Sequence, residues 1–122
     1  MYQPNCNSEF KRTHTLNSRV QESYRILMKY PDRIPVICEK SPQHNDLPSI
    51  DKKKFLVPCD FTIAQFTFVV RQRIKLRPNE AIFLFVNDQF VSGASTFGDI
   101  YNHYKDYDGF LYIQYNKENT FG

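Results

Sequence analysis

The side chains that most often catalyse reactions or bind metals are few in this sequence and widely separated. They are three histidines and three cysteines, namely His14, His44, His103, Cys6, Cys38 and Cys59. Helical metal ligands, a glycine-rich phosphate loop and a nucleophile elbow each need a characteristic local spacing, which the sequence lacks. A Cys–His dyad that forms only in the folded chain stays open. We therefore expect no enzyme, no cofactor and no metal site, and we expect reduced thiols in a cytosolic protein.

Gly122, the last residue, suggests a different chemistry. No side chain hinders attack at its carboxyl carbon, and glycine tolerates backbone conformations that let an extended tail enter a narrow enzyme channel. These properties suit activation of the terminal carboxylate and its transfer to an amine. A truncated chain would end in the same way, so the terminal glycine is weak evidence when taken alone.

The stretch 52–58 is the centre of a second hypothesis. Three lysines lead into Phe55, Leu56, Val57 and Pro58, which predicts a short strand. Proline cannot donate a ladder hydrogen bond, and lysines are common on exposed sheet edges. We hypothesise that this strand has a free edge that accepts an extended peptide from a partner. The alternative is an ordinary core strand with a solvated basic flank.

Hydrophobic periodicity and turn signals predict a helix at 15–29, strands at 34–39 and 54–57, and a central helix that begins at a capping box formed by Thr62 and Gln65. A strand at 82–86, a short strand at 89–91, a short helix at 96–104 and a final strand at 110–115 follow. Strands around one long central helix indicate an α+β fold with a mixed sheet.

The helix predicted at 15–29 carries one apolar stripe at helical spacing, formed by Leu16, Val20, Tyr24 and Leu27 or Met28. Ile26 lies off this stripe and shares a narrower face with Glu22, which suggests that the helix contacts the rest of the protein on two sides. Further along, Asp106 and Asp108 lie in a turn, where we expect solvation or turn hydrogen bonds.

Composition fits one domain. The chain has 122 residues, of which 41% are hydrophobic and 24% charged, and a formal net charge of +3. A nucleic-acid-binding domain would be more basic and its charge more clustered, so we expect no nucleic-acid partner. The sequence shows neither a signal peptide nor an apolar run of membrane-spanning length. Contact with a membrane is therefore expected to need an attached group.

Two groups of apolar residues converge if the predicted strands are neighbours. The strand faces opposite the central helix would bring together Pro35, Ile37, Lys54, Leu56, Phe110 and Tyr112, bordered by Glu22 and Ile26. On the other face, Phe55 would meet Phe61, Phe66 and Val69. A partly covered apolar groove beside a free strand edge suits peptide binding. A two-layer core would use many of the same residues.

Five segments closely resemble the autophagy ubiquitin-like modifiers of the GABARAP and light-chain-three type. They are 32–40, 50–58, 81–87, 108–112 and 118–122, which read DRIPVICEK, IDKKKFLVP, AIFLFVN, DGFLY and ENTFG. The resemblance covers about residues 30–122 and is weaker before them. Phe55 stands where the family commonly has tyrosine, the loop 42–45 looks longer, and Val91-Ser92-Gly93 replaces a proline-rich turn.

The resemblance implies a ubiquitin-like β-grasp fold with additional N-terminal helices. Residues 1–29 would form an arm and helices packed on the core, 30–116 the core, and 117–122 a flexible tail. It implies a non-enzymatic modifier that is cytoplasmic and monomeric when soluble. A family cysteine protease would expose Gly122, with Thr120 and Phe121 as the recognition tail.

Ubiquitin-type activating and conjugating enzymes would then join Gly122 to phosphatidylethanolamine on autophagosomal membranes. There the protein would support membrane expansion and recruit cargo receptors and adaptors that carry short aromatic-x-x-aliphatic motifs. Two alternatives of different class stay open. One is a ubiquitin-like modifier of proteins, and the other is an unconjugated cytoskeletal or trafficking adaptor.

The resemblance also implies the residues of the motif-binding site. The pocket for the aromatic residue would be formed by Glu22, Ile26, Pro35, Ile37, Lys54, Leu56 and Phe110. The pocket for the aliphatic residue would be formed by Phe55, Leu56, Phe61, Phe66, Val69 and Arg73. Acidic residues near the motif would be contacted by Arg33, Lys52 and Lys53.

Overall fold

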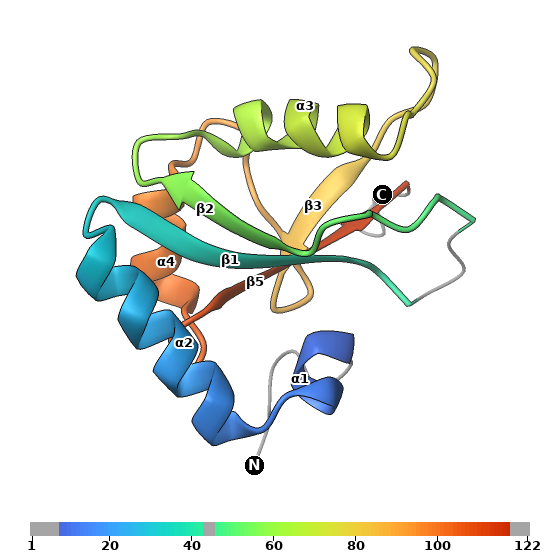
Figure 1. The fold of residues 1–122 in the computed structure, drawn as a ribbon. Coiled ribbons are helices and arrows are strands. Elements are labelled where there is room, and N and C mark those ends of the chain that lie inside the picture. Colours follow the sequence, from blue (N-terminus) through green and yellow to red (C-terminus); the bar gives the residue numbers. More distant parts are fainter. Residues whose placement is uncertain (1–7, 43–45, 118–122) are drawn as a thin grey trace.

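The computed structural model describes residues 8–42 and 46–117, which form a five-stranded sheet with helices on both faces (Figure 1). The helices are α1 (Glu9–Thr13), α2 (Leu16–Lys29), α3 (Ile63–Arg73) and α4 (Phe97–Tyr104). The strands are β1 (Arg33–Lys40), β2 (Lys54–Pro58), β3 (Phe83–Val86), β4 (Gln89–Phe90) and β5 (Leu111–Asn116). The α+β class and every predicted element are confirmed, with boundaries that shift by one or two residues.

The strand order in the sheet is β2-β1-β5-β3-β4. The inner strands β1 and β5 run parallel, and the other neighbouring pairs are antiparallel. The sheet is therefore mixed, as predicted, and β2 and β4 are its two edges. Because β2 joins the sheet only through β1, one side of its backbone has no strand partner in the described part of the chain.

Alternation along β1 separates two apolar clusters. Ile34, Val36 and Cys38 face the larger cluster, which also contains the buried residues of α3 and α4. Ile37 faces a smaller cluster on the other side of the sheet. Both faces of this strand are buried, as its sequence predicted. Complete burial and the neighbouring Glu39 charge raise the pKa of the Cys38 thiol, so this cysteine stays protonated at neutral pH.

The central helix α3 begins as its sequence requires. The Thr62 side chain accepts the backbone N–H of Gln65, and the Gln65 side chain accepts the backbone N–H of Thr62. Both donors would otherwise lack partners at a helix start. The buried positions are those expected from helical spacing, namely Ile63, Phe66, Val70 and Ile74.

The apolar stripe of α2 does not face the core, in contrast to the usual orientation of an amphipathic helix. The exposed fractions are 55% for Leu16, 40% for Val20, 62% for Tyr24 and 66% for Met28. The opposite side of the helix meets the protein instead, where Ile26 packs against the smaller cluster. The narrow face is therefore the docking face of this helix.

Asp108 is the reason for this orientation. Its carboxylate accepts hydrogen bonds from Arg19 (2.6 Å), the Tyr112 hydroxyl (2.5 Å) and the backbone N–H of Phe110 (2.8 Å). Its backbone carbonyl accepts the hydroxyl of Ser23 (2.5 Å). Of the two alternatives expected for this aspartate, turn hydrogen bonding is confirmed and solvation is not, because the side chain is 0% exposed. These bonds fix the rotation of α2 about its own axis.

The short helix α1 is held by contacts distant in sequence. Its five residues would not persist alone, because helix nucleation is unfavourable. Glu39 accepts the backbone N–H of Phe10 at 3.0 Å, and Lys11 pairs with Asp106 at 2.6 Å. The Phe10 ring is 5% exposed and meets Phe110 edge-on, with ring centroids 5.4 Å apart. As a result, α1 covers part of the smaller cluster.

Candidate functional site

The outer edge of β2 is free among the residues that the structure describes, as the central hypothesis requires. Cys38 donates its backbone N–H to the carbonyl of Lys53. This bond shows which residue pairs of β1 and β2 are hydrogen-bonded and which are not, because the two kinds alternate along an antiparallel pair. In this register the backbone groups of Phe55 and Val57 hydrogen-bond to β1, while the N–H and C=O groups of Lys54 and Leu56 point outward. The Leu56 carbonyl accepts one hydrogen bond from the Arg33 guanidinium at 3.3 Å.

The two prolines of this region occupy positions that need no donor. Pro35 lies opposite Leu56 in a non-hydrogen-bonded pair, and it precedes the first residue of β1 that pairs with β5. Pro58 ends β2 and has no N–H to offer at the outer edge. The usable free edge is therefore short and centred on Lys54 and Leu56.

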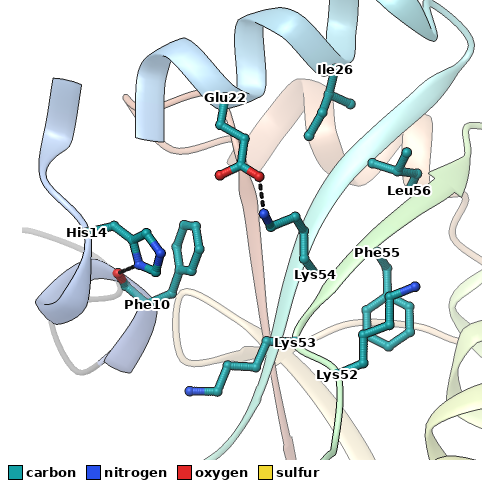
Figure 2. A pocket seen from close by; sticks show the side chains of 9 residues that line it. All are labelled: Phe10, His14, Glu22, Ile26, Lys52, Lys53, Lys54, Phe55 and Leu56. Atoms are coloured by element: carbon teal, nitrogen blue, oxygen red, sulfur yellow. Dashed lines mark hydrogen bonds and ion pairs between the residues drawn. The ribbon is translucent and has the colours of Figure 1, made fainter. Parts of the chain in front are cut away.

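A groove with a volume of about 800 Å³ lies beside this edge. Figure 2 shows its lining, to which α1, α2 and β2 all contribute. The residues that line it are Phe10, His14, Glu22, Ile26, Lys52, Lys53, Lys54, Phe55 and Leu56. The groove thus joins residues that are far apart in the sequence, of which Glu22, Ile26, Lys54 and Leu56 were predicted to converge.

One ion pair crosses the groove. The Lys54 ammonium of β2 donates to the Glu22 carboxylate of α2 (Figure 2). Farther along the groove, Ile26 of α2 and Leu56 of β2 lie on its two walls. The Lys54 and Glu22 side chains are 41% and 25% exposed. Such a partly solvated pair adds little stability, so a ligand can separate the two charges at small cost.

The residues beneath the groove are apolar and already packed. Ile37 and Phe110 are 0% exposed, and Pro35 is buried. Phe10 lies against Phe110 and stacks on His14, with the latter pair of ring centroids 4.2 Å apart. Of the seven residues predicted for the aromatic pocket, Glu22, Ile26, Lys54 and Leu56 line the opening, and the other three lie outside its lining.

Phe10 and His14 line the groove but were missed in the sequence. Their neighbours gave little signal, because an aromatic residue in a five-residue helix has no periodic partners. The only local indication was Ser8, whose side chain accepts the backbone N–H of Lys11 and marks a helix start. Apart from its stacking on His14, the contacts that place Phe10 in the groove are with residues distant in the sequence.

Five of the six residues predicted for the aliphatic pocket lie on the other side of β2, whereas Leu56 lies on the groove side. Phe55 meets Phe66 edge-on at a centroid distance of 5.2 Å. Phe61 and Val69 are half-buried and pack against the same cluster. The Arg73 guanidinium carbon lies 5.5 Å from the Phe55 ring centroid. Because Phe66 is 2% exposed, it supports this pocket from beneath.

The three cations predicted to meet acidic residues have different surroundings. Lys52 is exposed, and its ammonium lies 5.3 Å from the Phe55 ring centroid. Lys53 pairs with Glu9 and, at 3.5 Å, with Glu39, and burial lowers the pKa of its ammonium. Arg33 and Lys52 are therefore the more available partners for an acidic ligand.

The predicted conjugation residues Thr120, Phe121 and Gly122 lie outside the described residues, as does His44. Within 8–42 and 46–117, no group of three or more His, Cys, Asp or Glu side chains is arranged to hold a metal ion. None of the helices in those ranges has the length and apolarity needed to cross a membrane.

Comparison with known proteins gives consistent results. A family model described as "Autophagy protein Atg8 ubiquitin like" matches residues 18–122. The chain is 54% identical over 115 residues to Autophagy-related protein 8 of Mycosarcoma maydis, covering 94% of this chain and 97% of the relative. It is 53% identical over 115 residues to the protein of the same name from Colletotrichum lindemuthianum, covering 94% of each.

Among solved structures, that of Trypanosoma brucei ATG8 superposes with a TM-score of 0.86 at 43% identity, and the match covers 94% of this chain and 98% of the other. This likeness confirms the ubiquitin-like fold with added N-terminal helices. The sequence identity, the family model and the shared fold agree, and the chain belongs to the Atg8 family of ubiquitin-like autophagy proteins.

Proposed function

We propose that this protein is a non-enzymatic autophagy modifier that recruits cargo receptors and adaptors through aromatic-x-x-aliphatic motifs. The observation that carries the proposal is the free edge of β2 beside an apolar groove. A motif peptide adds a strand to Lys54 and Leu56, whose outward N–H and C=O groups lack strand partners. Backbone pairing supplies affinity, and the two pockets supply specificity.

In an added strand, successive side chains of the peptide point to opposite faces of the sheet, so two residues three positions apart lie on opposite faces. The aromatic residue enters the groove between Ile26 and Leu56, above Phe10. The aliphatic residue, three positions on, contacts Phe55 on the other side of β2, near Phe61 and Val69. Acidic residues next to the motif meet Arg33 and Lys52, which raises the rate of association more than the affinity.

The second half of the proposal is conjugation. A cysteine protease of the family exposes Gly122 after binding Thr120 and Phe121, and activating and conjugating enzymes form an amide between Gly122 and phosphatidylethanolamine. A two-chain lipid anchors a protein stably, whereas one acyl chain gives marginal binding. The cytoplasmic protein thereby reaches the autophagosomal membrane, supports its expansion and presents the groove to receptors.

The proposed division of the chain follows from these roles. Residues 1–29 supply one wall of the groove through α1 and α2, residues 30–116 supply the core and the β2 edge, and residues 117–122 supply the tail that is conjugated. The chain is proposed to act as a monomer before conjugation.

Mass spectrometry of the membrane-recovered protein tests conjugation. A phosphatidylethanolamine adduct on Gly122 supports the proposal, and a lysine isopeptide would show a modifier of proteins instead. The matched variant is Gly122→Ala, which should abolish the adduct. Membrane association that persists unchanged in this variant would favour an unconjugated adaptor.

The groove needs a separate test, because it does not depend on conjugation. Calorimetry with a synthetic aromatic-x-x-aliphatic peptide should give one binding site per chain, and Ile26→Ala should weaken it. Phe68→Ala is the matched control, since Phe68 is 60% exposed on α3. An equal loss of affinity in both variants would contradict the location of the site.

A further inference from the structure

The exposed stripe of α2 does not line the groove, and the residues that the structure describes leave it uncovered. Leu16, Val20, Tyr24 and Met28 recur every four residues, so they form one continuous ridge along the helix. At 1.5 Å per residue this ridge is about 18 Å long. Isolated apolar side chains are common on protein surfaces, but a continuous ridge of four marks an interaction site.

The helix cannot bury this ridge by rolling. Ser23 and Arg19 bind the Asp108 turn, and Ile26 packs in the smaller cluster, so three contacts on the inner side fix its orientation. Rotation would break these contacts and leave the Arg19 and Asp108 charges, which are 11% and 0% exposed, without partners. The ridge is therefore a stable feature of the surface.

The exposed charges that α2 itself places beside the ridge are positive. Arg25 and Lys29 each follow a ridge residue by one position, and both are exposed. Glu22 is the one acidic residue of α2, and it points toward the groove, where it binds Lys54. The Arg25 and Lys29 cations favour an anionic partner of the ridge over a neutral one. An anionic surface is complementary to it.

We propose that the ridge of α2 is a peripheral contact with anionic lipid bilayers, made by the protein without any covalent lipid. An apolar row bordered by Lys and Arg is the pattern of helices that lie in the membrane interface. The Leu16, Val20 and Met28 side chains enter the boundary between headgroups and acyl chains. Tyr24 has an apolar ring and a polar hydroxyl, which suits the headgroup level.

Two further features agree with this contact. Tyr107 is 89% exposed, and it precedes Asp108 in the turn that binds α2, so a second tyrosine is presented near the helix. The groove is lined by Glu22 and Ile26, which lie on other sides of α2 than Met28. A protein that rests on a bilayer through this ridge keeps the groove accessible to receptors.

The test uses the full chain, purified without conjugating enzymes and shown by intact mass to be unmodified. Its binding is measured by flotation with vesicles of phosphatidylcholine alone or with about one-third phosphatidylserine. We expect binding to the anionic vesicles, little binding to neutral ones and weaker binding at high salt. The double variant Tyr24→Ser/Met28→Ser should reduce the partition coefficient about tenfold or more.

Both substituted side chains are exposed, so the variant should remain folded, and circular dichroism checks this. Phe68→Ser is the matched control, because Phe68 is equally exposed on α3, away from the ridge. The proposal is overturned if wild type does not bind anionic vesicles, or if the double variant binds as well as wild type. It is equally overturned if Phe68→Ser has the same effect, or if the ridge instead mediates concentration-dependent self-association.

Discussion

The buried Arg19–Asp108 ion pair and the exposed Asp46–Lys117 ion pair have similar lengths. Comparing variants of the two tests whether burial or distance determines how much an ion pair contributes to stability. Substitution of Asp108 by alanine removes the acceptor of three hydrogen bonds and leaves the Arg19 guanidinium, 11% exposed, without its charged partner. Removing one member of a buried pair costs about 3–5 kcal/mol, because the remaining charge is left uncompensated. We therefore expect Asp108→Ala to lower the free energy of unfolding by about that amount.

The matched control is Asp46→Ala. Asp46 pairs with Lys117 at 2.7 Å, close to the 2.6 Å of the Arg19–Asp108 pair, but its side chain is 79% exposed. If distance decided the strength of an ion pair, the two variants would behave alike. Because exposed pairs are screened by water, we expect the Asp46→Ala midpoint to match that of wild type within error.

Urea unfolding followed by circular dichroism at neutral pH measures both variants. Adding Arg19→Met to Asp108→Ala removes the orphaned charge, so the double variant should recover about 1–3 kcal/mol relative to additivity. The reasoning fails if Asp108→Ala costs less than about 1 kcal/mol, or if the Asp46 variant is equally destabilised. A loss of this size is a large part of the ~5–15 kcal/mol that stabilises a typical domain.

Three further predictions concern the groove, pH and one glycine. Leu56→Ala should weaken a motif peptide by about 1–3 kcal/mol in calorimetry, and unchanged affinity in a folded variant would contradict the docking mode. Burial first, and then the Asp108 carboxylate, raise the pKa of Tyr112, so above about pH 10 the unfolded chain loses a proton that the folded protein keeps. Stability should therefore fall as the pH rises beyond that point, less steeply in Tyr112→Phe, as denaturant midpoints across the alkaline range would show. Gly109 has a φ of 91°, and an added Cβ would lie 2.4 Å from the Ser23 Oγ, so Gly109→Ala should cost about 2–4 kcal/mol; a melting temperature equal to wild type would refute this.

Local sequence signals predicted those parts of the fold that depend on neighbours in the chain. The capping box of Thr62 and Gln65 marked the start of α3, and alternation assigned the two faces of β1 correctly. The lysines and proline around Phe55 indicated an edge strand, and β2 is one. These features are set by hydrogen bonds and side-chain directions within a few residues, so the sequence carries them directly.

Features set by contacts between distant residues were harder to predict. The period of α2 was right and the contact through Ile26 is confirmed, but the contact expected through the apolar stripe was wrong. Arg19 and Ser23 bind a turn about 85 residues away, which periodicity cannot reveal. Phe10 reaches the groove through contacts with Glu39 and Phe110 for the same reason. The groove was therefore predicted from its β-strands and its α2 wall, while its α1 wall was missed.

The two ends of the sheet limit how copies of this protein can stack when they are crowded on one surface. Two chains can join through β2 about a two-fold axis, which consumes both of the longer edges. Among the described strands, each pair would then have only the β4 ends left, and β4 is two residues long. Too few backbone groups remain there to template another chain, so growth into fibrils stops at the pair.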